Sequence, residues 1–291
     1  MKKKEKYTIN EHYIPNSLLE LFRDDDGKFY YFNKQDKKIR NGRTSRACFV
    51  EDLYETTMHN SEKIYLLRNE IENALSNKEN NYIALVKKII SICSNPANKY
   101  ALILHTKEIP LLMEFIANLH LRNPDRLSFY MGNVPISEEG QKLEEEVKSV
   151  KKHNFEENDI LTMCEKAFET VRLKATVLNE SGNSWIEYFK RIMLDGRFCF
   201  IKSTNGDFIT SDNIAGVSSD DYIYLPLNCY YAVSVSLDKD GIKRVCHNRL
   251  CSCNDDAIDM INQLVYQEAK KYVYGKKETL TRFRQSNIIS K

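Results

Sequence analysis

Hydrophobic and polar positions follow a two-residue period near both ends of the chain and a three-to-four-residue period in its middle. Near the N-terminus, the aromatic run Lys28–Phe32 lies between two turn sequences, Asp24–Gly27 and Asn33–Asp36. Aromatic residues favour strands, whereas Asp, Asn and Gly favour turns. Residues 1–55 are therefore predicted to form a small β element with a hairpin, preceded by one or two helical turns over Asn16–Phe22.

The middle of the chain, residues 61–195, has the period of amphipathic helices and few Gly or Pro residues. The predicted helices cover Glu62–Ser76, Asn80–Ser94, Pro110–Leu121, Glu138–Lys152, Asp159–Leu178 and Ser184–Leu194. Asn123-Pro124 is expected to end the third helix, because a residue before proline avoids helical angles. The central part is thus predicted to be a helical bundle.

From residue 196 the period returns to two, which predicts an antiparallel sheet over residues 196–240. Asn205-Gly206 is typical of a type I′ turn, so Arg197–Lys202 and Asp207–Thr210 are predicted to pair as a hairpin. Further strands are expected at Tyr222–Leu227 and Tyr230–Leu237. A helix over 255–274 and a polar, basic tail over 275–291 complete an α+β fold. One composite domain is predicted, because no repeat or linker interrupts the chain.

Composition narrows the class of protein. The chain has 291 residues, 42% of them hydrophobic, which is enough for a substantial buried core. Apolar runs are shorter than the roughly 20 residues that cross a bilayer, and no apolar signal region follows the basic N-terminus. A cytoplasmic protein with no membrane partner is expected, and its eight cysteines are then expected to be free thiols.

The net charge of +2 is nearly neutral, but positive charge is concentrated locally. Between Lys37 and Arg46, five basic residues occur in ten positions without an acid. Such a patch can bind the phosphates of a nucleic acid or nucleotide. A solvated loop between two strands is the alternative interpretation.

The sequence contains none of the common enzyme fingerprints, such as a P-loop, a nucleophile elbow, HExxH or a Rossmann glycine motif. Cys246, Cys251 and Cys253 offer zinc-ligand chemistry, with His247 between them. Their spacing differs from paired CxxC knuckles, and no second pair lies elsewhere in the chain. Zinc is therefore disfavoured, and free thiols are expected here.

His12 lies between Glu11 and Tyr13, and histidine suits proton transfer near neutral pH. Neighbouring side chains on a strand point to opposite faces, so Glu11 and His12 are not expected to touch. A structural role for His12 is the alternative. Asp212 and Asn213 end a predicted strand, where functional side chains are common, although an Asx turn explains them equally.

The unit His12-Tyr13-Ile14-Pro15 resembles the N-terminal HYVP motif of a widespread, mainly bacterial family that is classed as a domain of unknown function. The similarity covers most of the chain and also rests on Gly27–Phe32, Tyr54-Glu55, Phe115–Pro124, Phe208–Asn213 and Ile261–Val265. Ile14 replaces valine, and Ile214 stands where the family usually has proline. The resemblance implies no established activity. It marks a polar set of six positions: His12, Glu70, Arg122, Asp212, Asn213 and Asn262.

Several of these six residues are expected to share one pocket. Their chemistry fits a nuclease-like phosphoester hydrolase, with His12 as general acid or base and Arg122 on a phosphate. Glu70 and Asp212 would bind a divalent metal such as magnesium or orient the reacting groups. Similar families suggest, by analogy, a role in bacterial defence against phage or mobile elements. The alternative is a non-catalytic binding or regulatory module, such as a nucleotide or protein sensor, in which His12, Arg122 and Asp212 form a structural polar network.

Overall fold

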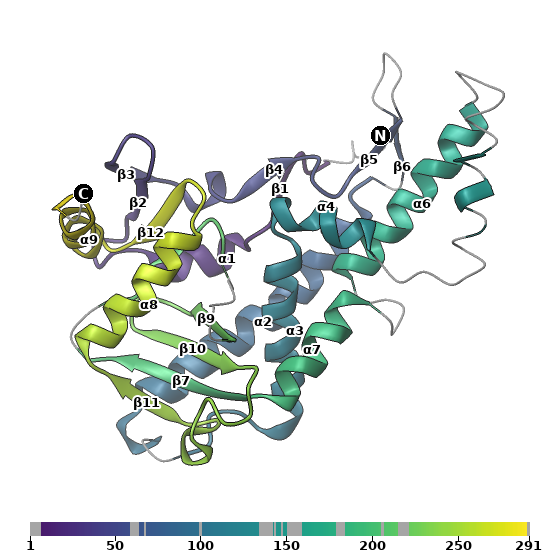
Figure 1. Cartoon of the computed structure of the whole chain (residues 1–291). Helices are drawn as coiled ribbons and strands as arrows, with labels where there is room; N and C mark the ends of the chain where they lie inside the picture. The colour runs from purple at the N-terminus through teal and green to yellow at the C-terminus, as the bar shows by residue number, and fades with distance from the viewer. Residues whose placement is uncertain are drawn as a thin grey trace, which may run out of the picture. The chain divides into compact units, whose positions relative to one another are not determined.

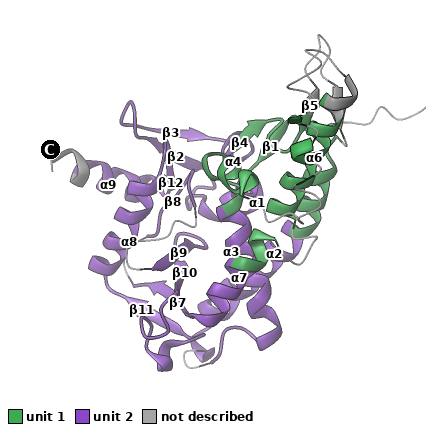
Figure 2. Cartoon of the chain, turned by 45° about the vertical axis from the view of Figure 1, so that its right-hand side comes forward, with its two compact units in different colours: residues 1–13, 49–78, 121–188 green, residues 14–48, 79–120, 189–291 purple. Residues whose placement is uncertain are grey.

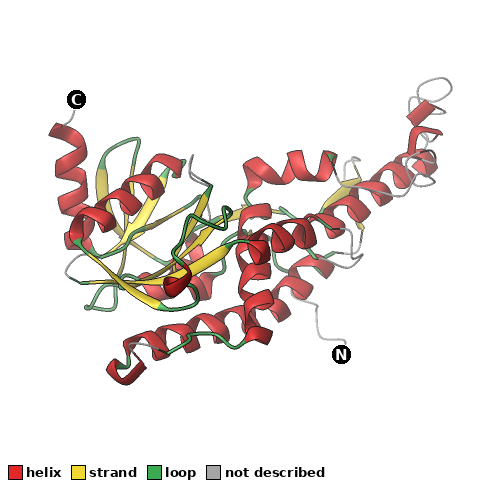
Figure 3. Cartoon of the chain, turned by 60° about the horizontal axis from the view of Figure 1, so that its bottom comes forward, coloured by secondary structure: helices red, strands yellow, loops and turns green. Residues whose placement is uncertain are grey.

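The computed structural model describes residues 7–58, 64–66, 68–98, 101–133, 142, 144–146, 148–149, 159–178, 184–204, 207–214 and 221–289. Helices and strands are mixed along these ranges, which confirms the predicted α+β class (Figures 1 and 3). The chain divides into two compact units (Figure 2). Unit 1 comprises residues 1–13, 49–78 and 121–188, and unit 2 comprises residues 14–48, 79–120 and 189–291.

Unit 1 combines two short strand pairs with helices. Strand β1 (Asn10–His12) pairs antiparallel with β4 (Phe49–Glu51), and β5 (Thr56–Met58) pairs antiparallel with β6 (Ile64–Leu66). The helices are α4 (Pro124–Gly132), α6 (Asp159–Val177) and the first parts of α2 (Glu70–Ser94) and α7 (Trp185–Asp195). Tyr54 packs in their apolar core beside Leu75, Leu127 and Leu173.

Unit 2 contains two four-stranded sheets. The first has the order β11-β7-β10-β9, with β7 (Arg197–Ser203), β9 (Tyr222–Pro226), β10 (Tyr231–Ser236) and β11 (Leu250–Cys253). Its pairs are antiparallel except β11 with β7, which is parallel. The second, fully antiparallel sheet has the order β3-β2-β12-β8, with β2 (Phe29–Asn33), β3 (Lys38–Gly42), β8 (Thr210–Ser211) and β12 (Tyr272–Gly275).

Helices α8 (Asp255–Glu268) and α9 (Lys277–Ile289) cover the sheets of unit 2 (Figure 1). Ile258 and Ile261 of α8 pack with Ile201 of the first sheet. Further along the same helix, Val265 packs with Val273 of the second sheet. Unit 2 also holds α1 (Asn16–Leu19), most of α3 (Ile109–Leu121) and the second part of α2. Because α8 packs on both sheets, it joins them into one unit.

The hairpin predicted between Arg197–Lys202 and Asp207–Thr210 is wrong. Strand β7 pairs with β10 and β11, whereas β8 pairs with β12 in the other sheet. The Asn262 side chain holds the segment before β8, because its Nδ2 donates to the Asp207 carbonyl at 2.9 Å and its Oδ1 accepts from the Ile209 N–H at 3.0 Å. The Asn-Gly turn itself lies outside the described residues.

The C-terminal prediction also needs correction. The helix expected over 255–274 ends at Glu268, and residues 272–275 form β12 in the interior of the second sheet. The expected polar tail contains helix α9. Lys34 caps the C-terminal end of α8, because its Nζ donates to the carbonyls of Tyr266 at 2.7 Å and Ala269 at 2.6 Å. A lysine near the last carbonyls of a helix satisfies orphan acceptors and suits the helix dipole.

The middle of the chain differs from the prediction in two places. Glu62–Ser76 and Asn80–Ser94 are not two helices, since β6 is followed by the single helix α2. No Gly or Pro breaks the chain between them, and Ile64–Leu66 favours a strand. Helix α3 ends at Leu121 as expected, but Pro124 also begins α4, which the sequence interpretation missed. Much of Glu138–Lys152 lies outside the described residues.

Within the described residues, no helix is both long and apolar enough to span a membrane. All eight cysteines are free thiols. The cytoplasmic location stays a prediction.

Candidate functional site

The motif histidine ends the short strand β1 of unit 1. Its neighbour Glu11 is fully buried, while His12 is half-buried with its ring 6.0 Å from the Phe49 ring. This difference in burial follows the alternation of side chains along a strand. Glu11 therefore faces the interior of unit 1, and the sequence interpretation gave it too little weight.

Arg122 binds the motif through the backbone. The side chain is only 1% exposed, and its Nη2 donates to the His12 carbonyl. Its Nε donates to the Tyr54 hydroxyl at 2.7 Å, and that hydroxyl donates to the same His12 carbonyl at 3.3 Å. A buried guanidinium requires such acceptors, because unpaired buried donors are costly. Arg122 and Tyr54 together hold the end of β1.

Glu11 forms an acid pair with Glu55. Its Oε2 accepts the Tyr54 N–H at 2.6 Å, and the Glu55 carboxyl group lies close enough to act on its pKa. Burial, with the nearby charges of Glu55 and Glu72, raises the pKa of Glu11 to about 8. Burial likewise raises the pKa of Glu55. At neutral pH the Glu11 carboxyl group is therefore mostly protonated.

Asn69 extends this network to the N-terminal segment. Glu55 Oε1 accepts the Asn69 N–H at 2.6 Å. Asn69 Oδ1 accepts the Thr8 N–H, and Asn69 Nδ2 donates to the Thr8 carbonyl, both at 2.9 Å. Asn69 has a φ of +60°, which asparagine tolerates better than most residues. Segments far apart in sequence are thereby tied together by polar contacts inside unit 1.

Glu70, the glutamate predicted from the resemblance, lies outside these contacts. Its exposed side chain pairs with Lys174 of α6, with Oε2 and Nζ 2.7 Å apart. Glu72, two residues further along α2, is the helix residue whose charge, with that of Glu55, acts on Glu11.

The remaining predicted residues belong to unit 2. The buried Asp212 carboxylate accepts three backbone N–H groups, from Lys270 at 2.8 Å, Lys271 at 2.8 Å and Tyr272 at 2.9 Å. Burial raises the pKa of Asp212, and these hydrogen bonds partly offset the shift. Asn213 Nδ2 donates to the Glu268 carbonyl at 2.9 Å. With Asn262, these side chains hold β8 against the connection between α8 and β12.

The structure thus joins two of the six predicted residues directly, His12 and Arg122. Glu70 lies elsewhere in unit 1, and Asp212, Asn213 and Asn262 form a second network in unit 2. A pocket shared by several of the six stays a prediction. Across the residues that the structure describes, no group of three His, Cys, Asp or Glu side chains is placed to hold a metal ion.

A different constellation lies on the second sheet of unit 2, on the face opposite the apolar cluster of Tyr30, Phe32 and Val273. The strand registers place four side chains on this face, and the side chain of Lys271, the residue before β12, contacts one of their rings; we call this set the tyrosine face. Its residues are Tyr31, Lys38, Arg40, Lys271 and Tyr272. The basic stretch is evident in the sequence, but the pair of rings is not, because Tyr272 was assigned to a helix.

The two tyrosine rings of this face are edge-on, with centroids 5.4 Å apart and an interplanar angle of 88°. Both side chains are half-buried, so part of each ring is accessible. A Cβ atom at position 42 would lie 3.0 Å from the Tyr31 ring, so Gly42 leaves room for that ring. Lys271 Nζ lies 5.1 Å from the centroid of the Tyr272 ring.

Charge on the tyrosine face is mainly positive. Lys38 and Lys271 are exposed, and Arg40 is within electrostatic reach of both tyrosines. Asp36 opposes this charge through an ion pair with Arg40, whose pKa is raised by the hydrogen bond to Asp36. This exposed pair is weak enough to exchange with another anion.

Fold and geometry define an α+β protein of two compact units that contain buried polar networks, with an aromatic and basic face on one sheet. The chain belongs to the family described as "Protein of unknown function (DUF4238)", whose model matches residues 10–279. This match confirms the resemblance to a family of unknown function. No curated protein and no solved structure matches the chain.

Proposed function

We propose that this protein is a binding module for single-stranded nucleic acid, and that the tyrosine face is its binding surface. The observation that carries the proposal is the accessible pair of rings, Tyr31 and Tyr272, beside Lys38, Arg40 and Lys271. Aromatic rings stack on unpaired bases whatever their sequence, while lysines and arginines bind the phosphates. A duplex hides the faces of its bases, so a single strand is the better ligand. The basic stretch Lys37 to Arg46 contributes part of this surface.

Replacing Tyr272 with alanine is expected to weaken binding of a fluorescent oligodeoxythymidine by about 5- to 150-fold, which corresponds to the loss of one base stack of roughly 1–3 kcal/mol. Fluorescence anisotropy at low salt measures this. Replacing Lys38 with alanine should instead lower the salt dependence of binding by about one unit of the log–log slope.

The matched control is Tyr188→Ala, because Tyr188 is 54% exposed but lies on α7 in unit 1. Its affinity should equal that of the wild-type protein. Binding that is unaffected by Tyr272→Ala, or equally strong for duplex and single strand, would contradict the proposal.

A second candidate is the nuclease-like phosphoester hydrolase, which the acid pair favours. Paired carboxyl groups with raised pKa values are typical of acid–base sites, and His12 is the residue next to Glu11 on β1. In this proposal His12 and Glu55 transfer protons, and Arg122 holds the motif in place rather than the phosphate. By analogy alone, the corresponding biological role is bacterial defence.

If the hydrolase proposal is correct, His12→Ala and Glu55→Gln should each lower hydrolysis of single-stranded DNA or RNA, measured with magnesium, by at least about 100-fold. The melting temperature of His12→Ala should stay near the wild-type value. A large drop in melting temperature together with no measurable wild-type hydrolysis would leave only the structural role for His12. Tyr272→Ala changes binding alone, so the two candidates are tested separately.

A further inference from the structure

Four thiols gather at one edge of the first sheet of unit 2. Cys199 lies on β7, Cys251 and Cys253 lie on the edge strand β11, and Cys246 ends the short helix η5 (Arg244–Cys246). All four belong to, or pack against, one apolar cluster that also contains Ile201. Neither the nucleic-acid proposal nor the acid pair uses these residues.

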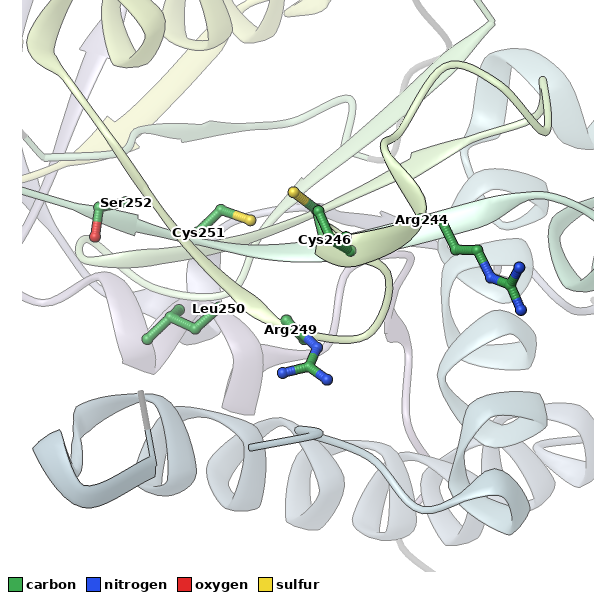
Figure 4. A pocket seen from close by; sticks show the side chains of 7 residues that line it. Arg244, Cys246, Arg249, Leu250, Cys251 and Ser252 are labelled. Carbon is green, nitrogen blue, oxygen red and sulfur yellow. The ribbon is translucent and has the colours of Figure 1, made fainter. Parts of the chain in front are cut away.

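Three of the four thiols are half-buried, and two of these three line a hollow. Cys246 and Cys251 are half-buried and line an open hollow of about 730 Å³, whereas Cys199 is only 8% exposed. Figure 4 shows the sulfur atoms of Cys246 and Cys251 pointing toward one another. A volume of this size is within the range of small-molecule sites.

The cluster makes Cys251 the nucleophile. Hydrogen bonds from Cys199 and then Cys246 lower the pKa of Cys251 to about 6. The hydrogen bond to Cys251, followed by burial, raises the pKa of Cys199, and burial raises the pKa of Cys246. At neutral pH, Cys251 is therefore a thiolate beside two protonated thiols. Thiolates, not thiols, attack disulfides.

We infer that Cys251 and Cys246 form a reversible thiol–disulfide pair that reacts with anionic low-molecular-weight disulfides in this hollow. Arg244 and Arg249 line the same hollow (Figure 4), so its rim carries positive charge. Their guanidinium groups extend away from the two sulfur atoms in this view. They are thus placed to meet carboxylates several bonds from the reacting disulfide, and arginine is well suited to carboxylates.

The reaction balances in two steps. The Cys251 thiolate attacks one sulfur of the small disulfide, forms a mixed disulfide and releases one small thiolate. Cys246 then loses its proton to that thiolate or to water, attacks the Cys251 sulfur and releases the second small thiolate. Two protein thiols are oxidised, and one small disulfide is reduced to two thiols.

Oxidised glutathione is a suitable probe for intact-mass analysis of the full chain. The wild-type protein should lose two free thiols without keeping an adduct, and Cys246→Ser should trap one glutathionyl group on Cys251. Cys251→Ser should form neither product. Cys199→Ser should still form the Cys246–Cys251 disulfide. The control is Cys93→Ser, which changes a buried thiol. Burial raises the pKa of this thiol to about 12, so the variant should react like the wild-type protein. An adduct on another cysteine, or none on Cys251 of Cys246→Ser, would overturn the inference.

Two further measurements separate this site from ordinary thiol chemistry. In Cys246→Ser, the rate of adduct formation should rise with pH and reach half its maximum at a midpoint pH. This midpoint should lie at least several tenths of a unit below the value of about 8.5 that an ordinary thiol shows. Arg249→Gln and Arg244→Gln should slow the reaction with oxidised glutathione by about 3-fold or more but leave the reaction with neutral 2-hydroxyethyl disulfide unchanged. A midpoint near 8.5 would overturn the role of Cys251 as a thiolate. Equal slowing for both disulfides would overturn the preference for anionic ones.

Discussion

Arg122→Ala is expected to lower the free energy of unfolding by about 3–5 kcal/mol, the largest effect of any single substitution considered for this protein. The change removes the donors to the His12 carbonyl and the Tyr54 hydroxyl, both inside unit 1. It also leaves a cavity, because Arg122 is among the largest fully buried side chains. Urea denaturation followed by circular dichroism measures the loss.

Two variants make the Arg122 result specific. Tyr54→Phe removes the acceptor of the Arg122 Nε bond but keeps the ring, so it should cost about 1–3 kcal/mol. Arg43→Ala removes an exposed guanidinium and should change stability by less than about 0.5 kcal/mol. If Arg122→Ala costs no more than Arg43→Ala, the contacts with His12 and Tyr54 do not stabilise the fold.

Stability that falls as the pH rises from about 5 to 8 is the second large expected effect. Burial raises the pKa of Glu11 from its ordinary value of 4.5 to about 8, so the folded protein binds a proton that the unfolded chain releases. This contribution is fully present below pH 4.5 and is lost as the pH rises through 8. Its slope is at most about 1.4 kcal/mol per pH unit. Denaturation at a series of pH values measures it.

Glu11→Gln isolates this effect, because glutamine resembles the protonated acid. Its carbonyl can accept the Tyr54 N–H, and its amide can donate to Glu55. The variant should equal the wild-type protein in stability near pH 5 and exceed it near pH 8. Glu51→Gln, which changes an exposed carboxylate on β4, should keep the wild-type pH dependence. If the stability of the wild-type protein changes between pH 5 and pH 8 as that of Glu11→Gln does, Glu11 ionises with its ordinary pKa.

Local patterns predicted the elements whose partners are close in sequence. The β2–β3 hairpin and strands β9 and β10 follow from alternation and turn residues within about ten positions of each other. Tyr272–Gly275 was missed, because four residues after a helix carry too little pattern to separate strand from helix. This segment forms a strand because it pairs with β2, more than 200 residues earlier in the chain. Hydrogen bonds from its first backbone N–H groups to the Asp212 carboxylate also hold it in place.

The candidate sites divide in the same way. The motif resemblance pointed to His12 and Arg122, which the structure joins. The resemblance did not show that the Arg122 guanidinium group donates to a backbone carbonyl and not to a ligand. Burial, which decides this, is not visible in a sequence. Glu11 was underestimated because its partner Glu55 lies 44 positions away. The tyrosine face requires the register of three strands, which no local pattern contains.

The interleaving of the two units limits how such a chain can arise in evolution. Six segments alternate between the units, which makes five boundaries. Fusing two ancestral genes end to end creates one boundary, so a single fusion does not produce this arrangement. Any continuous deletion long enough to remove one unit also removes parts of the other. The two units are therefore expected to be inherited together, as the family match from residue 10 to residue 279, which spans both, illustrates.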